Sequence, residues 1–117
     1  MAKYLIIFND PPYGNEKVYN GLRYAITLSL QKEVSLRLFL IGDSVVCAKK
    51  GQKVPSGFYN TEIMLNTVAK NNVEIGVCGT CIDARGIKEE ELIEVAHKSS
   101  MAELTKWTLE ADKVISF

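Results

Sequence analysis

Residues 73–86 read VEIGVCGTCIDARG, and the fold can be inferred outward from this stretch. Val73–Val77 is a short apolar run rich in β-branched residues, which is typical of a buried strand. Ile82–Arg85 has the character of one helical turn, and Gly86 is suited to close it. A strand therefore passes into a helix here, with two cysteines in the connection, and we expect an α/β protein.

Strands and helices are expected to alternate along the rest of the chain. Four further apolar runs predict strands, which brings the expected number to five. The β-α-β-α order favours a mostly parallel sheet covered on both faces, a three-layer α/β/α sandwich in a single domain of residues 1–117. The other expected strands are Tyr4–Phe8, Ser35–Ile41, Glu94–Lys98 and Val114–Phe117, and the expected helices follow Asn15, cover Ser44–Lys49, Asn60–Lys70 and Lys88–Leu92, and begin after Ser100.

Three of these helices carry patterns that predict how they pack. The helix after Asn15 has so many apolar positions that we expect it to be well buried. The helix over Asn60–Lys70 is expected to turn one apolar face to the core. Ser100 and Glu103 have the spacing of a capping box, and Trp107 is expected to pack the last helix. The positions concerned are Val18, Leu22, Ala25, Ile26, Leu28 and Leu30 in the first, Ile63, Met64, Thr67 and Val68 in the second, and Leu104 and Leu109 beside Trp107 in the last.

Composition and charge narrow the possible partners. Lys plus Arg and Asp plus Glu number 14 each, so nothing electrostatic favours nucleic acid or an anionic membrane as a partner. Near-zero net charge also lowers the barrier to self-association. No apolar stretch approaches the roughly 20 residues of a membrane span, and the N-terminal apolar run is too short for a secretory signal. We therefore expect a cytoplasmic protein whose cysteines stay reduced.

Cys78 and Cys81 are the residues best suited to chemistry. They follow a strand directly, and parallel sheets place functional groups at the carboxyl ends of their strands. A free thiol with a pKa of about 8.5 is only about 3% ionised at pH 7, so a reactive cysteine needs groups that favour its thiolate. The start of the next helical turn supplies N–H groups, Gly79 allows the backbone to come close, and Arg85 could add a positive charge.

Other interpretations of the cysteines remain open. Buried cysteines often only fill space, and Cys47, beside Val45 and Val46, is assigned to such packing. A thioredoxin-like dithiol is a second alternative, although that motif belongs near the first strand and helix rather than in the second half of a chain. A structural zinc site needs four ligands, whereas Cys78 and Cys81 supply two, so we expect neither a metal nor another cofactor.

A few other polar residues are weaker candidates. Asp10 and Asp43 follow strands and could contact a substrate, but Asp at such places often serves only the turn. Tyr13 is a candidate for a pocket wall or an interface. His97, the only histidine, could act as a base or a thiol partner, while an ordinary hydrogen-bonded histidine is the simpler interpretation. None of them forms a motif of its own, so thiol chemistry remains the leading interpretation.

Five segments of the chain share the pattern of one known family. They are Asn9–Asn15, Gly42–Val45, Cys78–Gly86, Ser100–Leu104 and Trp107–Asp112, and the cysteine segment is the most specific. Together with the strand spacing they extend over nearly the whole chain, which resembles the DsrE/DsrF-like family and, within it, the small YchN-like group. The resemblance implies a flavodoxin-like fold with a five-stranded parallel sheet, and homo-oligomers that are often trimers or hexamers.

The resemblance also implies a chemical role. In the sulfur-relay members of the family, a cysteine after the third strand carries a persulfide and passes its sulfane sulfur between partner proteins. Its position relative to Arg85 and Gly86 makes Cys78 the corresponding residue. Cys81 is an additional thiol that the relay subunits generally lack. It could attack a persulfide on Cys78, form a disulfide and release the sulfur as sulfide.

The leading prediction is therefore a sulfur-carrier or sulfurtransferase-like protein. Cys78 would bear the persulfide, Cys81 would resolve or assist, and Arg85 with local N–H groups would stabilise the anion. Donor and acceptor would be proteins or small thiols, and the fold would have to hold the Cys78 sulfur open to them and readily ionised. The alternatives are a non-enzymatic homo-oligomeric binding or scaffold module and a dithiol redox protein. Further substrate contacts are expected from Gly79, Thr80, Asp10 and Tyr13.

Overall fold

The computed structural model describes all 117 residues and has a five-stranded sheet at its centre. The strands lie in the order β4-β3-β2-β1-β5, and every neighbouring pair is parallel. The five predicted strands are confirmed, with ends that shift by one or two residues. Their bounds are Ala2–Phe8 (β1), Val34–Leu40 (β2), Glu74–Cys78 (β3), Ala96–Ser99 (β4) and Lys113–Ser116 (β5).

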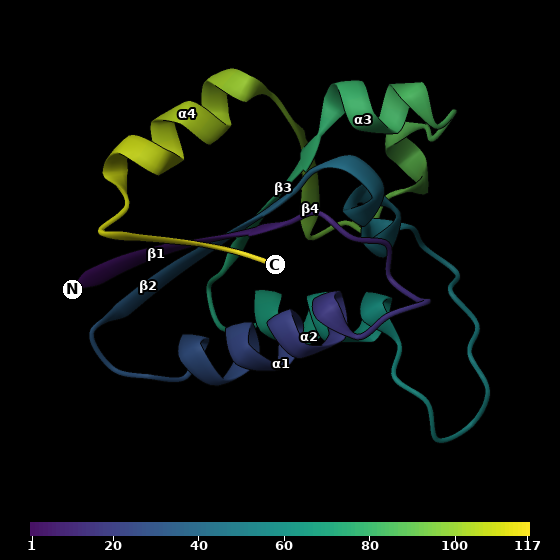
Figure 1. Ribbon diagram of the computed structural model, residues 1–117, viewed down its shortest axis with the longest axis horizontal. Coiled ribbons are helices and arrows are strands. Elements are labelled where there is room, and N and C mark those ends of the chain that lie inside the picture. The colour runs from purple at the N-terminus through teal and green to yellow at the C-terminus, as the bar shows by residue number, and fades with distance from the viewer.

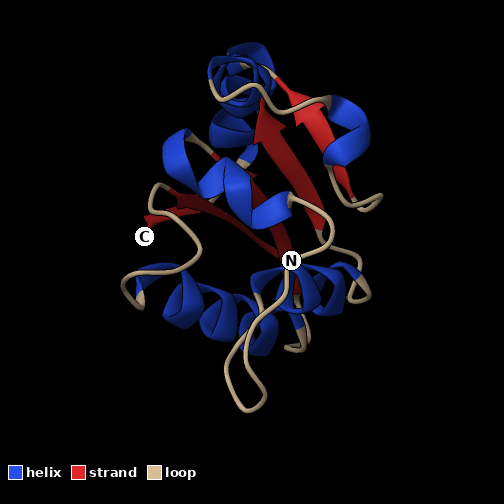
Figure 2. Ribbon diagram, turned by 90° about the vertical axis from the view of Figure 1, so that its right-hand side faces the viewer, coloured by secondary structure: helices blue, strands red, loops and turns tan.

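Helices cover both faces of this sheet, as the predicted α/β/α sandwich requires. Helices α1 and α2 lie together on one face, and α3 and α4 lie on the other (Figures 1 and 2). The short helices expected over Ser44–Lys49 and Lys88–Leu92 are 3-10 helices, named η1 and η2 here. The bounds are Lys17–Ser29 (α1), Gly42–Ala48 (η1), Thr61–Ala69 (α2), Gly79–Ala84 (α3), Glu89–Glu91 (η2) and Met101–Glu110 (α4).

The central strands are most deeply buried towards their carboxyl ends, where both faces of the sheet are covered. Three consecutive residues of β2, Leu38, Phe39 and Leu40, have no exposed surface. A strand with only one covered face would expose every second side chain. Each such side chain contributes about 1.5–3 kcal/mol through its removal from water. The sheet is therefore a rigid platform for whatever follows the ends of its strands.

The helices on the α1 and α2 side differ from the sequence prediction in which residues they bury. Helix α1 buries Val18, Leu22 and Ala25 but leaves Leu30 66% exposed, so only one side of it enters the core.

In α2 the buried positions are Thr61, Leu65 and Val68, whereas Ile63 is 62% exposed. The predicted face was wrong because residues two apart point about 200° apart on a helix, which sets Ile63 opposite Leu65. The last helix also buries Trp107 but exposes Leu109 by 81%.

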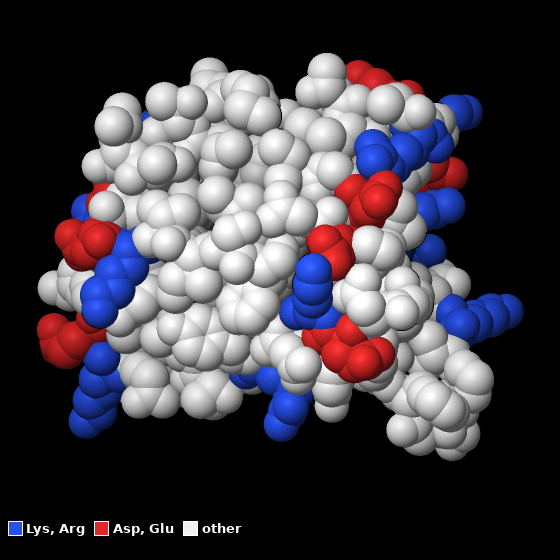
Figure 3. Space-filling model, in the orientation of Figure 1, with Lys and Arg blue, Asp and Glu red and all other residues white.

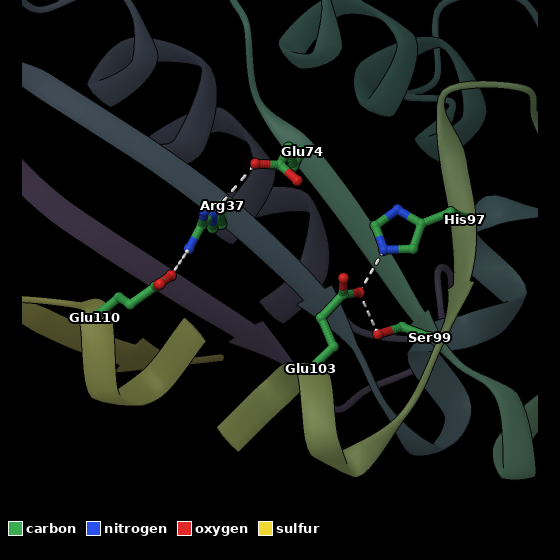
Figure 4. A network of polar contacts seen from close by, with 6 residues as sticks. All are labelled: Arg37, Glu74, His97, Ser99, Glu103 and Glu110. Atoms are coloured by element: carbon green, nitrogen blue, oxygen red, sulfur yellow. Dashed lines mark hydrogen bonds and ion pairs between the residues drawn. The ribbon is translucent and has the colours of Figure 1, made fainter. Parts of the chain in front are cut away.

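Side-chain caps hold two of the helix starts where they were expected. Asn60 accepts a hydrogen bond from the Ile63 N–H at 3.2 Å, and Ser100 accepts one from the Glu103 N–H, also at 3.2 Å. The capping box at Ser100 is only half formed. The Glu103 carboxylate accepts hydrogen bonds from Ser99 and His97 instead of returning to the backbone of Ser100 (Figure 4).

The remaining cap expected from the sequence is displaced by a residue. Helix α1 has Glu16 at its N-cap, and the side chain of Asn15 accepts a hydrogen bond from the Lys17 N–H at 3.0 Å. In the segment of residues 73–86, Gly86 follows α3 with φ at +66°, in the left-handed region that glycine adopts without strain.

None of the helices has the length and apolar character needed to cross a membrane.

Candidate functional site

The cysteine pair lies where β3 ends and α3 begins. Cys78 is both the last residue of the strand and the N-cap residue of the helix, and Cys81 is the third residue of that helix. Gly79 lets the helix start against the end of β4. A Cβ atom there would lie 2.9 Å from Cε of Lys98 and 3.0 Å from the backbone oxygen of Ser99. The sharp passage from strand to helix therefore depends on glycine at this position.

Several donors surround the sulfur of Cys78. Burial acts to raise the pKa of this thiol, but hydrogen bonds to the sulfur outweigh it and the pKa is lowered. The groups that lower the pKa are the side chains of Cys81 and Thr80 and the backbone N–H groups of the same two residues, and of these the Thr80 hydroxyl is within hydrogen-bond distance. The Thr80 Oγ1 atom is 3.4 Å from the sulfur. The start of α3 thus favours the thiolate form of Cys78, as expected from the sequence.

The expected open access to Cys78 is wrong for the isolated chain. Only 2% of this residue is exposed. Its two neighbours in α3 are nearer to solvent, since Thr80 is exposed and Cys81 is half-buried. The Cys78 sulfur therefore lies directly beneath side chains that reach the surface, rather than at the surface itself.

Cys81 has contacts of a different kind. Its sulfur accepts a hydrogen bond at 3.2 Å from the N–H of Gly42, the first residue of η1. Burial and the neighbouring Cys78 raise the pKa of Cys81, while the Gly42 N–H and the charge of Arg85 act in the opposite direction. The two thiols therefore have opposite tendencies. Cys78 tends to lose its proton at a lower pH than Cys81.

Arg85 stands beside Cys81 rather than beside Cys78. Its guanidinium donates to the backbone oxygen of Cys81 at 3.0 Å and pairs with the Asp43 carboxylate at 2.7 Å. On the other side of α3, Asp83 pairs with Lys98 of β4 at 3.3 Å. The helix that carries the thiols is thus tied to η1 on one side and to β4 on the other.

Asp10 and Tyr13 have no contact with the thiols. The Asp10 carboxylate accepts a hydrogen bond from Asn15 at 3.2 Å and pairs with Lys17 at 3.6 Å, which is turn chemistry. The Tyr13 hydroxyl donates to Gln52 at 2.6 Å, and the Tyr13 ring stacks on Tyr59. Tyr13 instead lines an open hollow of about 400 Å³ with Lys53, Val54, Pro55, Phe58 and Tyr59.

Cys47 and His97 also stand apart from the pair. Cys47 has no exposed surface, and burial raises its pKa to about 12, so its assignment to packing is confirmed. His97 contacts Glu103 and the edge of the Trp107 ring, in a network of polar contacts on the α4 side of the sheet (Figure 4). No group of three or more His, Cys, Asp or Glu side chains is arranged to hold a metal ion.

Two contributors to the site were not found from the sequence. The N–H of Gly42 contacts a cysteine 39 residues further along the chain. Lys98 lies over Gly79 and pairs with Asp83 although 15 residues separate the two partners. The sequence predicts that Asp43, next to Gly42, follows a strand, but no local pattern indicates which strand-end loop meets the thiols.

Comparison with known proteins places these features in a family. The DsrE/DsrF-like family matches residues 2–117. The protein YchN of Escherichia coli (strain K12) is 43% identical over 118 residues, with all of both chains covered. An uncharacterised protein of Methanocaldococcus jannaschii, MJ0989, is 37% identical over 115 residues, which cover 98% of this chain and 99% of the relative.

Solved structures agree with the fold. The crystal structure of YchN from Escherichia coli superposes with a TM-score of 0.93 at 43% identity and full coverage of both chains. The protein of unknown function MTH1491 from Methanobacterium thermoautotrophicum gives a TM-score of 0.80 with full coverage, but at 11% identity it supports the fold alone. From sequence and structure together, this chain belongs to the DsrE/DsrF-like family.

Proposed function

We propose that this protein carries sulfane sulfur as a persulfide on Cys78, in the manner of a sulfur carrier or sulfurtransferase. The observation that carries the proposal is the set of donors around the Cys78 sulfur, which lowers its pKa despite burial. The thiolate is the nucleophilic form of cysteine, and a cysteine that serves only packing needs no such donors. Membership of a family with sulfur-relay members agrees with this chemistry.

The transfer itself is a simple exchange. The Cys78 thiolate attacks the terminal sulfur of a persulfide donor, a small thiol or a protein that bears an S–SH group. A bond forms between the Cys78 sulfur and that sulfur atom, and the bond to the donor sulfur breaks. The donor leaves as a thiolate with the bonding electron pair. Thiol exchange depends on the thiolate of the attacking cysteine in the same way.

Transfer requires that the Cys78 sulfur become accessible to a donor. Thr80 is exposed, and its hydroxyl lies 3.4 Å from the sulfur. Exposed side chains change rotamer within picoseconds to nanoseconds. The proposal therefore includes a local movement at the start of α3 that opens the Cys78 sulfur to the donor.

Mass spectrometry of the intact chain tests the proposal. Reduced protein is mixed with glutathione persulfide, and a gain of about 32 Da, one sulfur atom, is expected. In wild type, attack by Cys81 on the persulfide would remove the added sulfur atom. The mass gain is therefore measured in Cys81→Ser, which lacks that thiol. Cys78→Ser in the same background should gain nothing, and Cys47→Ser serves as the matched control that still loads. Equal loading without Cys78 contradicts the proposal.

The homo-oligomeric state remains part of the proposal, because a specific surface favours it. Strand β5 is an edge of the sheet, and Val114 on it is 45% exposed. Tyr24, Met101 and Leu109 are also exposed large apolar side chains. The face over α4 and β5 shows few charged atoms in its middle (Figure 3). Exposed edges and apolar patches of this kind commonly meet a partner chain.

Light scattering during size-exclusion chromatography tests the association. We expect a mass of several chains, as trimer or hexamer, for wild type and a shift towards one chain for Val114→Lys. Thr67→Lys, at an exposed polar position of α2 on the opposite face of the sheet, is the control that should not change the mass. A wild-type mass of one chain at every concentration contradicts this part of the proposal, and it would leave a single-chain carrier.

A further inference from the structure

Cys81 is placed to react with whatever forms on Cys78. The two residues are the N-cap and third positions of α3, where the N-cap side chain and the third residue approach each other. The side chain and the backbone N–H of Cys81 are among the groups that favour the Cys78 thiolate. A second thiol therefore lies in the same helical turn as the Cys78 sulfur before any partner arrives.

The surroundings of Cys81 suit a thiolate that forms later than that of Cys78. Gly42, with φ at +62°, directs its N–H to the Cys81 sulfur at 3.2 Å, and the positive charge of Arg85 acts on the same sulfur. One cause that opposes ionisation of Cys81 is the negative charge of Cys78. Once Cys78 is bonded to a second sulfur atom, its own sulfur no longer carries that charge. Ionisation of Cys81 then becomes easier.

We propose that Cys81 resolves the persulfide on Cys78, so that this site releases sulfane sulfur as hydrogen sulfide. The inference rests on the proposed persulfide of Cys78. The Cys81 thiolate attacks Sγ of Cys78, a bond forms between the two cysteine sulfurs, and the bond from Cys78 to the terminal sulfur breaks. The terminal sulfur leaves as hydrosulfide with the bonding pair, and the Cys81 proton goes to solvent or to that hydrosulfide.

The electrons of this step balance within the site. The sulfane sulfur gains two electrons and becomes sulfide, and the two cysteines lose two electrons and become a disulfide. Return to the starting state needs two electrons from a dithiol reductant, either a small dithiol or a protein dithiol, by thiol–disulfide exchange. The protein then works as a sulfane-sulfur reductase that a dithiol drives.

Release inside the chain has a kinetic advantage over transfer to a partner. A well-oriented group in the same molecule can act like a reactant at an effective concentration on the order of 10⁵ M. Even a much less favourable orientation exceeds the millimolar or lower concentration of an external thiol. An external thiol must also reach a residue that is 2% exposed, whereas Cys81 lies in the same first turn of α3.

A single-turnover experiment tests the inference. Reduced wild type, Cys81→Ser and Cys78→Ser are each mixed with one equivalent of glutathione persulfide without added reductant, and both free sulfide and intact mass are followed over time. We expect wild type to release sulfide and to lose about 2 Da as its disulfide forms. Cys81→Ser should keep the gain of one sulfur atom and release sulfide at least tenfold more slowly. Cys81→Ala is run in parallel in case serine perturbs the fold.

The outcomes separate this inference from the proposed function. If wild type and both Cys81 variants keep the added sulfur for the same time, the role of Cys81 is wrong and the persulfide carrier stands. If no variant that retains Cys78 gains sulfur or releases sulfide, the proposed function itself fails. A disulfide in wild type that forms with no sulfide released also overturns the inference, because it indicates a redox dithiol.

Discussion

The surroundings of Cys47 and Cys78 differ more than their burial suggests. The two residues are 0% and 2% exposed, yet burial raises the pKa of Cys47 to about 12, while the pKa of Cys78 is lowered despite burial. Cys47 lies in the core with one side-chain donor, Thr61. Cys78 ends a strand and receives donors from the first turn of α3. The groups that favour the thiolate, more than the exposed area of the residue, therefore distinguish Cys78 from Cys47.

The largest expected effect is in the rates at which the two cysteines are alkylated. With a pKa of about 12, Cys47 is about 10⁻⁵ ionised at pH 7, whereas an ordinary thiol is about 3% ionised and the lowered pKa of Cys78 favours its thiolate further. Iodoacetamide labelling at pH 7, read by peptide mass spectrometry, should favour Cys78 at least about a thousandfold. Labelling of the denatured chain is the control, and there the rates should be alike. Comparable alkylation rates of Cys47 and Cys78 in the native protein would contradict the difference in their ionisation.

The next effect concerns stability in alkali. Because the pKa of Cys47 is raised in the folded state, its contribution to stability is fully present below the unfolded pKa of about 8.5 and is lost as the pH rises towards 12. Cys47→Ala has no thiol to ionise. The stability difference between wild type and Cys47→Ala should therefore fall by about 2 kcal/mol between pH 8.5 and pH 10.5, measured by urea unfolding. Parallel pH curves would contradict the assignment.

A smaller effect tests one donor to Cys78. Thr80→Val keeps the shape of the side chain that covers Cys78 and removes its hydroxyl, 3.4 Å from the sulfur. The pKa of Cys78 should rise, and its alkylation at pH 7 should slow by about threefold to tenfold, which corresponds to roughly 1 kcal/mol of hydrogen bonding. Thr80→Ser retains the donor and should label like wild type. Faster alkylation of Cys78 in Thr80→Val would contradict a stabilising role for the Thr80 hydroxyl and would indicate that access limits the rate.

The smallest effect concerns the ion pair that ties α3 to η1. Arg85 and Asp43 are 2.7 Å apart, but their side chains are 32% and 62% exposed. Partly exposed pairs contribute at most about 1 kcal/mol, so Arg85→Gln and Asp43→Asn should each cost no more than that in urea unfolding. Their coupling in a double-mutant cycle should weaken with added salt. A loss of several kcal/mol would show that α3 depends on this pair for its position.

The fold was predictable because its signals are local. An apolar run such as Leu38–Leu40 can only be buried, and polar side chains such as Asn60 and Ser100 satisfy free N–H groups at the next helix start. The face of α2 was misjudged because Ile63 and Leu65 are equally apolar. Only the position of the helix on the sheet decides which of the two faces the core.

The candidate site was predictable only in part, for the same reason. The strand end and the helical turn place Cys78, Gly79 and Cys81 together through local geometry alone. The donor to Cys81 comes from Gly42, which tertiary packing brings near, and no sequence pattern encodes that contact. Arg85 was correctly placed near the thiols, but the sequence could not indicate that it would serve Cys81 and Asp43 rather than Cys78.

Burial was the other property that the sequence misjudged. A residue at the carboxyl end of a strand is expected to meet solvent, yet Cys78, where β3 passes into α3, is only 2% exposed. Asp10 and Tyr13 also follow a strand, and they turn away from the thiols towards Lys17 and Gln52. A shared sheet edge therefore does not bring side chains into one site.

The most direct test of this account is the titration of each cysteine by NMR in the wild-type protein, through the carbon-13 chemical shift of its Cβ. Cys78 is expected to ionise first, with its midpoint lowered relative to that of an ordinary thiol. Cys81 should follow at a higher pH, and Cys47 should still be protonated at pH 10. A Cys78 midpoint at or above that of Cys81 would contradict the claim that the start of α3 stabilises its thiolate.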